Sequence, residues 1–302
     1  MANLSIVLAG GSGFLGTHLR SALTERGHSV TALVRRPDAR PGEATWDPYA
    51  GVVPQAVIDA ADVVVNLAGS PTLGNPHSKA WATDLSRSRI TTTRVLAEAI
   101  AAAPNPPAFL AGNGISYYGD HGAAVLTEVS DTRGHALLTV VTRDWQAATA
   151  AAASAGSRVC ILRTAPVMDR RGAPLKQQRL QFRAGLGGRL GNGRQYMPMI
   201  SLRDWVGAVV HLAESPDASG PFNLCLPTAP TNREFTAALA RAVHRPAVIT
   251  APAAVLRVAA GEMASELLGS LNVRPAALEA SGYTFLDPDV EAMLVTGLGV
   301  SD

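Results

Sequence analysis

Residues 4–26, LSIVLAGGSGFLGTHLRSALTER, contain the features that decide the fold. The run Leu4–Ala9 is almost entirely apolar and ends in glycines, which is typical of a parallel strand buried on both faces. Phe14–Arg26 follows with apolar residues at helical spacing on one side, and Gly27 ends it. This stretch therefore predicts a strand, a glycine turn and an amphipathic helix.

The same alternation of short apolar runs and helical stretches continues through the first half of the chain. Further strands are predicted at Ser29–Val34, Asp62–Leu67, Ala108–Ala111 and Arg158–Leu162. Helices are predicted between them at Ser86–Ala103 and Thr139–Ala155. Alternation of this kind predicts an α/β fold, a Rossmann-type doubly wound parallel sheet.

The character of the sequence changes after Thr164. The segment 185–193, GLGGRLGNG, is more than half glycine, which predicts a loop of low intrinsic order that could act as a lid. Thr231 and Glu234 have the spacing of a capping box at the start of a helix. The elements predicted beyond the glycine-rich segment are a helix at Arg203–Glu214, a strand at Pro221–Cys225 and a helix at Asn232–His244.

The glycine turn near the N-terminus has the spacing of a dinucleotide-binding loop, GxxGxxG. Glycine is needed there because the backbone must turn sharply and approach a pyrophosphate without a Cβ in the way. The helix that follows points its N-terminal amides at the anion. The strand before the loop and the helix after it supply the context that the motif requires. We therefore expect dinucleotide contacts from Gly10, Ser12, Gly13, Phe14, Leu15 and Gly16.

The end of the second predicted strand indicates which dinucleotide is bound. An NAD site normally carries Asp or Glu about 20 residues after the glycines, whereas this chain has Arg35 and Arg36 there. Two guanidiniums suit a 2′-phosphate, which they can grip bidentately, although a pair of solvated arginines is the alternative. We predict NADP(H), with NAD as the alternative cofactor. Further cofactor contacts are expected at later strand ends, from Asn66, Leu67, Ala68, Gly69 and Arg163.

Composition and length set the remaining bounds. Twenty-six Lys and Arg against 24 Asp and Glu give a net charge of +2, which argues against nucleic acid or an acidic membrane as a partner. Two widely separated cysteines and seven histidines without ligand spacing argue against a metal site or a disulfide framework. No apolar run is long enough to span a membrane, and the first residues lack a basic n-region, so we expect a cytoplasmic protein, a monomer or a homodimer, that acts on a small molecule. We predict a nucleotide-binding domain at 1–164 and a smaller α/β substrate region at 165–302, interleaved with it.

Taken together, these residues resemble the extended short-chain dehydrogenase/reductase superfamily. More narrowly, the chain is similar to the atypical NADP-binding branch often labelled sugar-nucleotide epimerase or cell-division inhibitor-like. Besides the glycine loop, the matching motifs include Trp46-Asp47-Pro48, Asn66–Gly69, Ser88-Arg89, Tyr117–Asp120, Arg143–Trp145, Leu162–Thr164, Gly193–Gln195, Thr231–Phe235 and Gly261–Met263. The resemblance implies a Rossmann domain, bound NADP and a substrate cleft formed with the C-terminal region.

The superfamily's usual catalytic pair, Tyr-x-x-x-Lys on one helix, does not occur in this chain. In that pair the ammonium lowers the pKa of the phenol so that the phenol can pass a proton. Alignment on Trp145 puts Leu138 at the tyrosine position and Thr142 at the lysine position, and neither side chain can do this work. The candidates for stabilising or protonating an oxyanion are Asn113, Ser116, Tyr117 and Tyr118, with packing or turn-capping roles as the alternative for each.

Three classes of function remain open. The missing base and the predicted NADP site favour one-way reduction, so we predict an NADPH-dependent ketoreductase. Its substrate would be a ketone activated by its own hydrogen bond, as in aromatic polyketides, and in this respect the chain is similar to antibiotic-pathway reductases of the simocyclinone angucyclinone type. The alternatives are a sugar-nucleotide epimerase or dehydratase and an NADP-binding regulatory protein without turnover. Substrate contacts are predicted at Arg194, Gln195 and Met199, with a solvated loop tip as the alternative.

Overall fold

The apolar run at the start of the chain forms an inner strand of a parallel sheet. In the computed structural model, which describes residues 3–72 and 74–299, strand β1 is Ser5–Ala9. It pairs in parallel with β2 (Ser29–Val34) on one side and β4 (Val63–Asn66) on the other. Met1 and Ala2, which belong to the segment without a basic n-region, lie outside the described residues.

Among the described residues, seven strands form the central sheet in the order β11-β7-β5-β4-β1-β2-β3. The strands not yet given are β3 (Glu43–Thr45), β5 (Ala108–Gly114), β7 (Val159–Thr164) and β11 (Gly220–Leu224). Because the order runs outward in both directions from the β1–β4 pair, this junction is the topological switch point where open α/β sheets bind their ligands. The Rossmann-type α/β fold predicted from the sequence is confirmed.

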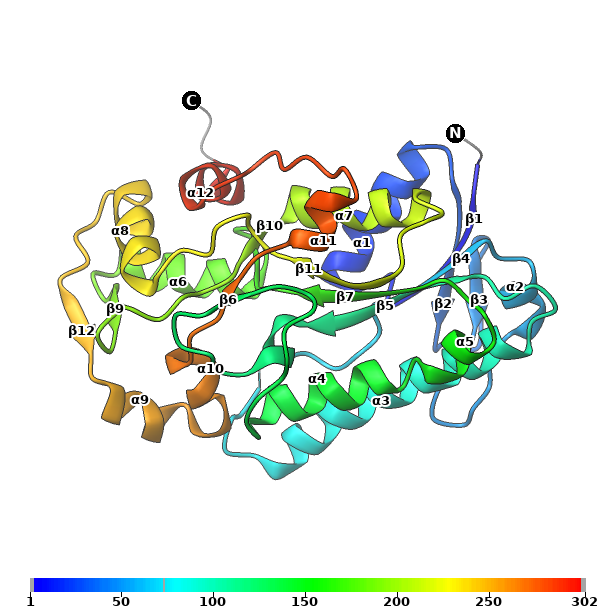
Figure 1. Cartoon of the computed structure of the whole chain (residues 1–302), viewed down its shortest axis with the longest axis horizontal. Helices are drawn as coiled ribbons and strands as arrows, with labels where there is room; N and C mark the ends of the chain where they lie inside the picture. Colours follow the sequence, from blue (N-terminus) through cyan, green and yellow to red (C-terminus); the bar gives the residue numbers. More distant parts are fainter. Residues whose placement is uncertain (1–2, 73, 300–302) are drawn as a thin grey trace. The chain divides into compact units, whose positions relative to one another are not determined.

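Helices cover both faces of this sheet. Figure 1 shows α1 (Phe14–Glu25) and residues 206–214 of α7 (Leu202–Glu214) on one face, with α3 (Lys79–Ala102) and α5 (Ala150–Ser154) on the other. Helix α3 begins earlier than predicted because Ser78 caps it, accepting a 3.2 Å hydrogen bond from the Trp81 backbone N–H. The helix predicted at Thr139–Ala155 is two helices, α4 (Leu137–Ala147) and α5. A short helix, α2 (Gln55–Asp59), precedes β4.

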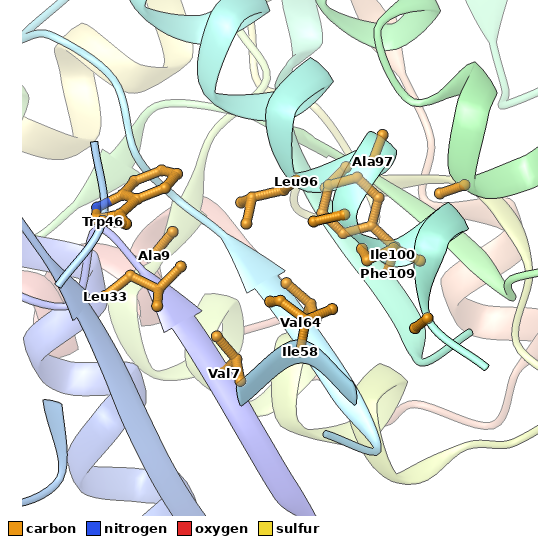
Figure 2. Close-up of a cluster of buried hydrophobic side chains, with 14 of the residues drawn as sticks. Val7, Ala9, Leu33, Trp46, Ile58, Val64, Leu96, Ala97, Ile100 and Phe109 are labelled. Atoms are coloured by element: carbon orange, nitrogen blue, oxygen red, sulfur yellow. The ribbon is translucent and has the colours of Figure 1, made fainter. Parts of the chain in front are cut away.

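The core of the sheet is made by side chains from the strands and from α3. Figure 2 shows Val7, Val64 and Phe109 of the strands facing Leu96 and Ile100 of α3. Burial of each leucine-sized side chain stabilises the fold by roughly 1.5–3 kcal/mol relative to exposure. The near-continuous apolar strands predicted from the sequence are therefore the ones that this core requires.

Residue contacts divide the chain into two compact units. Unit 1 comprises the described residues up to Asn113, Val141–Leu162 and Val206–Pro221, and unit 2 comprises Gly114–Val140, Arg163–Trp205 and the described residues from Phe222 onward. The predicted division at 164 lies close to one of these boundaries, but residues 114–140 belong to unit 2 and residues 206–221 to unit 1. The chain returns to unit 1 after Trp205 because α7 and the start of β11 complete the layers of the central sheet.

Unit 2 is built from short strands, paired two by two, and short helices. The strand pairs β8–β10, β9–β12 and β6–β13 are all parallel. The strands are β6 (Val125–Leu126), β8 (Val167–Met168), β9 (Gly188–Leu190), β10 (Ile200–Ser201), β12 (Ile249–Ala251) and β13 (Asn272–Val273). The helices are α6 (Ala173–Arg183), α8 (Asn232–Ala242), α9 (Ala253–Ala259), α10 (Ala264–Leu268), α11 (Ala276–Ala280) and α12 (Val290–Leu298), with 3₁₀ turns η1 (Ile115–Tyr118) and η2 (Gly261–Met263).

The glycine-rich segment 185–193 differs from the prediction. Part of it is β9, paired with β12, so the expectation of a loop of low order is wrong there. A Cβ on Gly188 would lie 2.2 Å from the Ile249 carbonyl oxygen, and one on Gly187 would lie 2.4 Å from the Phe182 ring. Gly187 and Gly188 therefore permit close packing at these two positions. The capping box of Thr231 and Glu234 at the start of α8 is confirmed.

Within the described ranges, every helix falls short of the length or the apolar character that a bilayer crossing demands.

Candidate functional site

The turn between β1 and α1 in unit 1 admits only glycine at two positions. Gly10 has φ +81°, and a Cβ there would lie 2.6 Å from the carbonyl carbon of Leu67. A Cβ on Gly16 would lie 2.2 Å from the carbonyl oxygen of Gly10. The first turn of α1 thus lies directly against the loop, and the loop against the end of β4. This is the close approach that a dinucleotide-binding turn requires.

The N-terminus of α1 lacks a protein cap. Its N-cap residue is Gly13, no side chain caps it among the described residues, and its first turn contains no acidic residue. The amides of Phe14, Leu15 and Gly16 are therefore the orphan donors that a helix start leaves, with the positive end of the helix dipole behind them. Ser12 is exposed beside them. A phosphate group fits this donor set.

Asn66 fixes the segment that lies against Gly10. Its side chain is fully buried, its Oδ1 accepts a 3.0 Å hydrogen bond from the Ala68 N–H, and its Nδ2 donates to Thr93 Oγ1 at 2.9 Å. The Leu67 N–H donates to the Ala9 carbonyl at 2.9 Å. Asn66 therefore positions Leu67, Ala68 and Gly69 through its side chain. Both polar atoms of that side chain are engaged in these hydrogen bonds. The cofactor contacts predicted for these three residues would therefore be made by their backbone atoms.

Arg35 and Arg36 are both exposed after β2, but their partners differ. Arg36 donates to the Glu43 carboxylate and, at 3.0 Å, to the Asp38 carbonyl. The Arg40 backbone N–H, together with the Arg36 guanidinium, holds the pKa of Glu43 below its usual range, so this carboxylate stays ionised. Arg35 has no hydrogen bond or ion pair within residues 3–72 and 74–299. Only one of the two predicted guanidiniums therefore keeps its charge available for a ligand.

Asn113, the last residue of unit 1 before the chain enters unit 2 at Gly114, is held by α4. Its side chain is buried, and its Nδ2 donates to the Thr142 carbonyl at 3.0 Å. Leu138 and Thr142 lie on α4 one turn apart, where the missing Tyr-x-x-x-Lys pair would stand. Neither side chain titrates, so this face of α4 has no acid or base to offer at those positions.

Tyr118 in unit 2 is committed to structural contacts. Its side chain is fully buried, its hydroxyl donates to Asn223 Oδ1 at 2.6 Å, and it accepts from Arg163 at 2.8 Å. Burial raises the pKa of Tyr118 to about 12. Arg163 is also buried and stacks 3.6 Å from the centre of the Tyr117 ring. These contacts favour the packing interpretation for Tyr118, and they do not support a cofactor contact for Arg163.

Tyr118→Phe is expected to lower the free energy of unfolding by about 1–3 kcal/mol, because it leaves a buried amide oxygen and a buried guanidinium without their shared partner. Tyr117→Phe is the matched control, since no hydrogen bond from its hydroxyl occurs among the described residues and its loss should stay within ±0.5 kcal/mol. Urea unfolding of both variants measures the difference. Equal stability of the two would show that the Tyr118 hydroxyl has no such role.

Ser116 contacts a carboxylate that the sequence analysis missed. Its hydroxyl donates to Glu266 Oε2 of α10 at 2.7 Å, and Ser116 is 8% exposed. Burial raises the pKa of Glu266, and the Ser116 hydrogen bond offsets this only in part. The neighbouring motif Gly261–Met263 was the only signal nearby, and it carries no hint of a partner 150 positions away in sequence.

The residues predicted to contact substrate lie in different settings. Arg194 is exposed, while the Gln195 side chain is buried and donates to the Leu190 carbonyl at 3.0 Å. Met199 is fully buried in the core of unit 2. The structure does not support a substrate contact for Met199, because no part of its side chain is accessible. Gln195 positions the chain around β9.

Two family models match the chain. The model described as the NAD dependent epimerase/dehydratase family matches residues 6–225, and a domain of unknown function, DUF1731, matches residues 251–296. Epimerase family protein Mb2239 of Mycobacterium bovis is 40% identical over 286 residues, which cover 94% of each chain.

Two solved structures extend this likeness to three dimensions. The crystal structure of human epimerase family protein SDR39U1, isoform 2, with NADPH has a TM-score of 0.88 and 32% identity, covering 99% of this chain and 100% of that one. A structure described as the nucleoside-diphosphate sugar epimerase from Corynebacterium glutamicum has a TM-score of 0.80 and 31% identity, covering 99% of this chain and 59% of that one.

Proposed function

Because this chain belongs to the NAD dependent epimerase/dehydratase family, we propose that it is an NADP(H)-dependent oxidoreductase that reduces an activated carbonyl group. The observation that carries the proposal is the glycine turn of unit 1. This turn packs closely against the end of β4, and it leads into the N-terminus of α1, which no side chain caps among the described residues. The NADPH in the human SDR39U1 crystal structure supports the same cofactor here, with NAD as the alternative.

The chain's own residues would hold the cofactor at two places in unit 1. The first-turn amides after Gly13 would bind the pyrophosphate, and Arg35 would bind the 2′-phosphate. When bound, NADPH supplies a hydride for the carbonyl carbon. The backbone of Leu67 and Ala68, fixed by Asn66, would border the nucleotide. Gly10 and Gly16 keep this surface free of Cβ atoms.

Arg35→Ala is expected to weaken NADPH binding about tenfold to a hundredfold and to leave NADH binding unchanged, because a charge-assisted contact to the 2′-phosphate exists only with NADPH. Arg36→Ala is the matched control, since its guanidinium already pairs with Glu43 and its removal should change the NADPH affinity less. Fluorescence titrations of the three proteins with both dinucleotides measure the effect. An unchanged NADPH affinity in Arg35→Ala would contradict this assignment.

The missing Tyr-x-x-x-Lys pair supports reduction over epimerisation. Leu138 and Thr142 cannot strip a proton from an alcohol, which an epimerase that oxidises a sugar must do first. A ketone that is hydrogen-bonded to a phenol of the same molecule is already activated, so it needs less stabilisation of the oxyanion by the protein. The narrower substrate hypothesis that follows is an aromatic polyketide ketone. The names of the similar proteins do not point to such a substrate. The likeness to the Corynebacterium glutamicum protein supports sugar-nucleotide epimerisation as the second candidate.

NADPH oxidation with chosen carbonyl probes tests the proposal. Phenanthrenequinone and a hydroxyanthraquinone represent activated carbonyls, and UDP-glucose represents sugar nucleotides. We expect loss of the nicotinamide absorbance with the quinones and none with UDP-glucose. An isomerised sugar nucleotide without net loss of absorbance would establish epimerisation instead. Tight NADPH binding without turnover of any probe would refute the oxidoreductase and leave a regulatory NADP-binding protein.

A further inference from the structure

We propose that Glu43 sets how strongly this chain prefers NADPH to NADH, because its carboxylate competes with the 2′-phosphate for the guanidinium of Arg36. The inference deepens the proposed function, since it names a specificity determinant of the cofactor site, and it rests on that function. Every residue that it uses lies in unit 1, on β3 or in the loop between β2 and β3.

Strand β3 brings Glu43 to the loop that follows β2. The strand pairs in parallel with β2 at the edge of the central sheet. Glu43 and Thr45 are two positions apart on this strand, so their side chains leave the same face of it. The Thr45 hydroxyl donates to the Arg36 carbonyl at 3.0 Å, and the Glu43 carboxylate accepts from the Arg36 guanidinium. The strand therefore fixes both the backbone and the side chain of Arg36.

The Glu43 carboxylate is held in its ionised form. Its Oε2 accepts a 2.9 Å hydrogen bond from the Arg40 backbone N–H in addition to the bond from Arg36. The Arg40 N–H, together with the Arg36 guanidinium, lowers the pKa of Glu43 against the opposing effect of burial. The Glu43 side chain is 13% exposed, whereas that of Arg36 is 42% exposed. Glu43 is thus a largely covered anion on a cation that a ligand can still reach.

Arg36 has donors left for a phosphate group. Its Nε–H donates to the Asp38 carbonyl at 3.0 Å, and one further N–H donates to Glu43. The other N–H groups of this guanidinium have no partner within residues 3–72 and 74–299. Arg35 and Arg36 are consecutive, so their Cα atoms are about 3.8 Å apart and both long side chains serve the same region. A phosphate monoester carries nearly two negative charges at neutral pH, of which Arg35 matches one.

The carboxylate is a competitor that the phosphate can displace only in part. An ion pair with an exposed cation is weak in water, whereas a guanidinium binds a phosphate through two parallel charge-assisted bonds. Glu43 therefore lowers the gain from the 2′-phosphate without removing it. NADH has an uncharged 2′-hydroxyl at this place, so its binding gains nothing from a released guanidinium. The carboxylate thus narrows the difference in affinity between the two dinucleotides.

Asp38 supplies the matched control. It is an exposed carboxylate two residues from Arg36, and its side chain has no hydrogen bond or ion pair in the described part of the chain. Its contact with Arg36 is through the backbone carbonyl. Asp38→Asn therefore removes the same charge from the same loop without releasing the guanidinium.

The test titrates the wild type, Glu43→Gln and Asp38→Asn with 2′,5′-ADP and with 5′-AMP by calorimetry. These probes differ only in the 2′-phosphate. Glu43→Gln is expected to bind 2′,5′-ADP about tenfold more tightly, because Arg36 adds a charge-assisted contact, and to bind 5′-AMP with unchanged affinity. Its amide oxygen can still accept the Arg40 N–H. Asp38→Asn should change either affinity less than about twofold, because salt screens an exposed charge.

Two double variants show whether Glu43 acts through Arg36. In an Arg36→Ala background, Glu43→Gln should change the affinity for 2′,5′-ADP no more than Asp38→Asn does, since there is no guanidinium to release. In an Arg35→Ala background, Glu43→Gln should restore most of the lost affinity, because Arg36 then binds the phosphate. A gain of full size without Arg36 would overturn the inference, since simple repulsion by the carboxylate would explain it.

A further readout needs no ligand. In protein labelled with ¹³C at the glutamate carboxyls, the Glu43 signal, assigned by its loss in Glu43→Gln or Glu43→Ala, should titrate below the usual value of 4.5. Arg36→Ala should move this titration upward, because the Arg36 guanidinium helps to lower the pKa of Glu43. A titration that is the same with and without Arg36 would show that the pair does not form, and it would overturn the inference.

The outcomes separate the inference from the proposed function. A wild-type protein that binds 2′,5′-ADP no more tightly than 5′-AMP refutes the NADPH site and with it the role of Glu43. A wild-type protein that prefers 2′,5′-ADP, with Glu43→Gln no different from Asp38→Asn, refutes the role of Glu43 alone.

Discussion

Gly10→Ala is expected to lower the free energy of unfolding by about 3 kcal/mol or more and to abolish NADPH binding. Two costs add at this position. The residue has φ +81°, which costs a non-glycine residue roughly 1–2 kcal/mol. The new Cβ would also lie 2.6 Å from the Leu67 carbonyl carbon. This is a backbone atom, which cannot move away as a flexible side chain can, and overpacking of this kind costs a further 1–3 kcal/mol or so.

Gly51→Ala separates the two costs. Gly51 has φ +72°, but nothing lies within 4 Å of a Cβ placed there. It should therefore cost only about 1–2 kcal/mol and leave NADPH affinity unchanged. Denaturant unfolding and fluorescence titration of both variants give the comparison. If the two alanines had equal effects, the close contact between the loop and β4 would have no energetic weight.

Asp204→Asn is expected to lower the free energy of unfolding by about 3 kcal/mol. The Asp204 carboxylate is fully buried and accepts hydrogen bonds from the Tyr283 hydroxyl at 2.9 Å and from the backbone N–H groups of Leu286 and Asp287, both at 2.8 Å. Its Oδ2 is also 3.1 Å from Ser201 Oγ. An asparagine would set its own N–H₂ against one of these donors, and the segment before α12 would lose its anchor.

The control is Asp217→Asn, an exposed carboxylate that should change stability by no more than about 0.5 kcal/mol. The pH dependence adds a second check through Asp287. Burial alone would raise the pKa of Asp287, but hydrogen bonds from Arg203, Ser201 and Thr296 hold it below its usual value of 3.8. Its stabilisation is therefore present above pH 3.8 and lost as the pH falls through the folded value. Asp204→Asn as stable as Asp217→Asn would contradict the anchor.

The elements that could be predicted from the sequence are those whose signal is local. The apolar run of β1 and the capping box of α8 depend on neighbouring residues alone, and β2 has the predicted bounds Ser29–Val34. β3, with the sequence EAT, has no apolar run, and it forms because β2 offers a free edge. The glycine content of residues 185–193 predicted a loop, which is wrong at β9. This strand depends on its pairing with β12, a segment distant in sequence.

The candidate site follows the same division. The glycine loop was predictable because its spacing and its flanking elements are contiguous. Arg35 and Arg36 looked equivalent, since only β3 brings Glu43 to one of them. Ser116 was a candidate without a partner until α10 supplied Glu266. Tyr118 was predicted to stabilise or protonate an oxyanion, and Arg163 was predicted to contact the cofactor. Their burial and their mutual hydrogen bond depend on tertiary packing, which the sequence does not display.

A crystal structure of the protein grown with NADPH would show directly which residues hold the dinucleotide. We expect the pyrophosphate within hydrogen-bond distance of the first-turn amides of α1, and the 2′-phosphate on the guanidinium of Arg35. Density for the dinucleotide at another place, with the amides after Gly13 bonded to water alone, would contradict it.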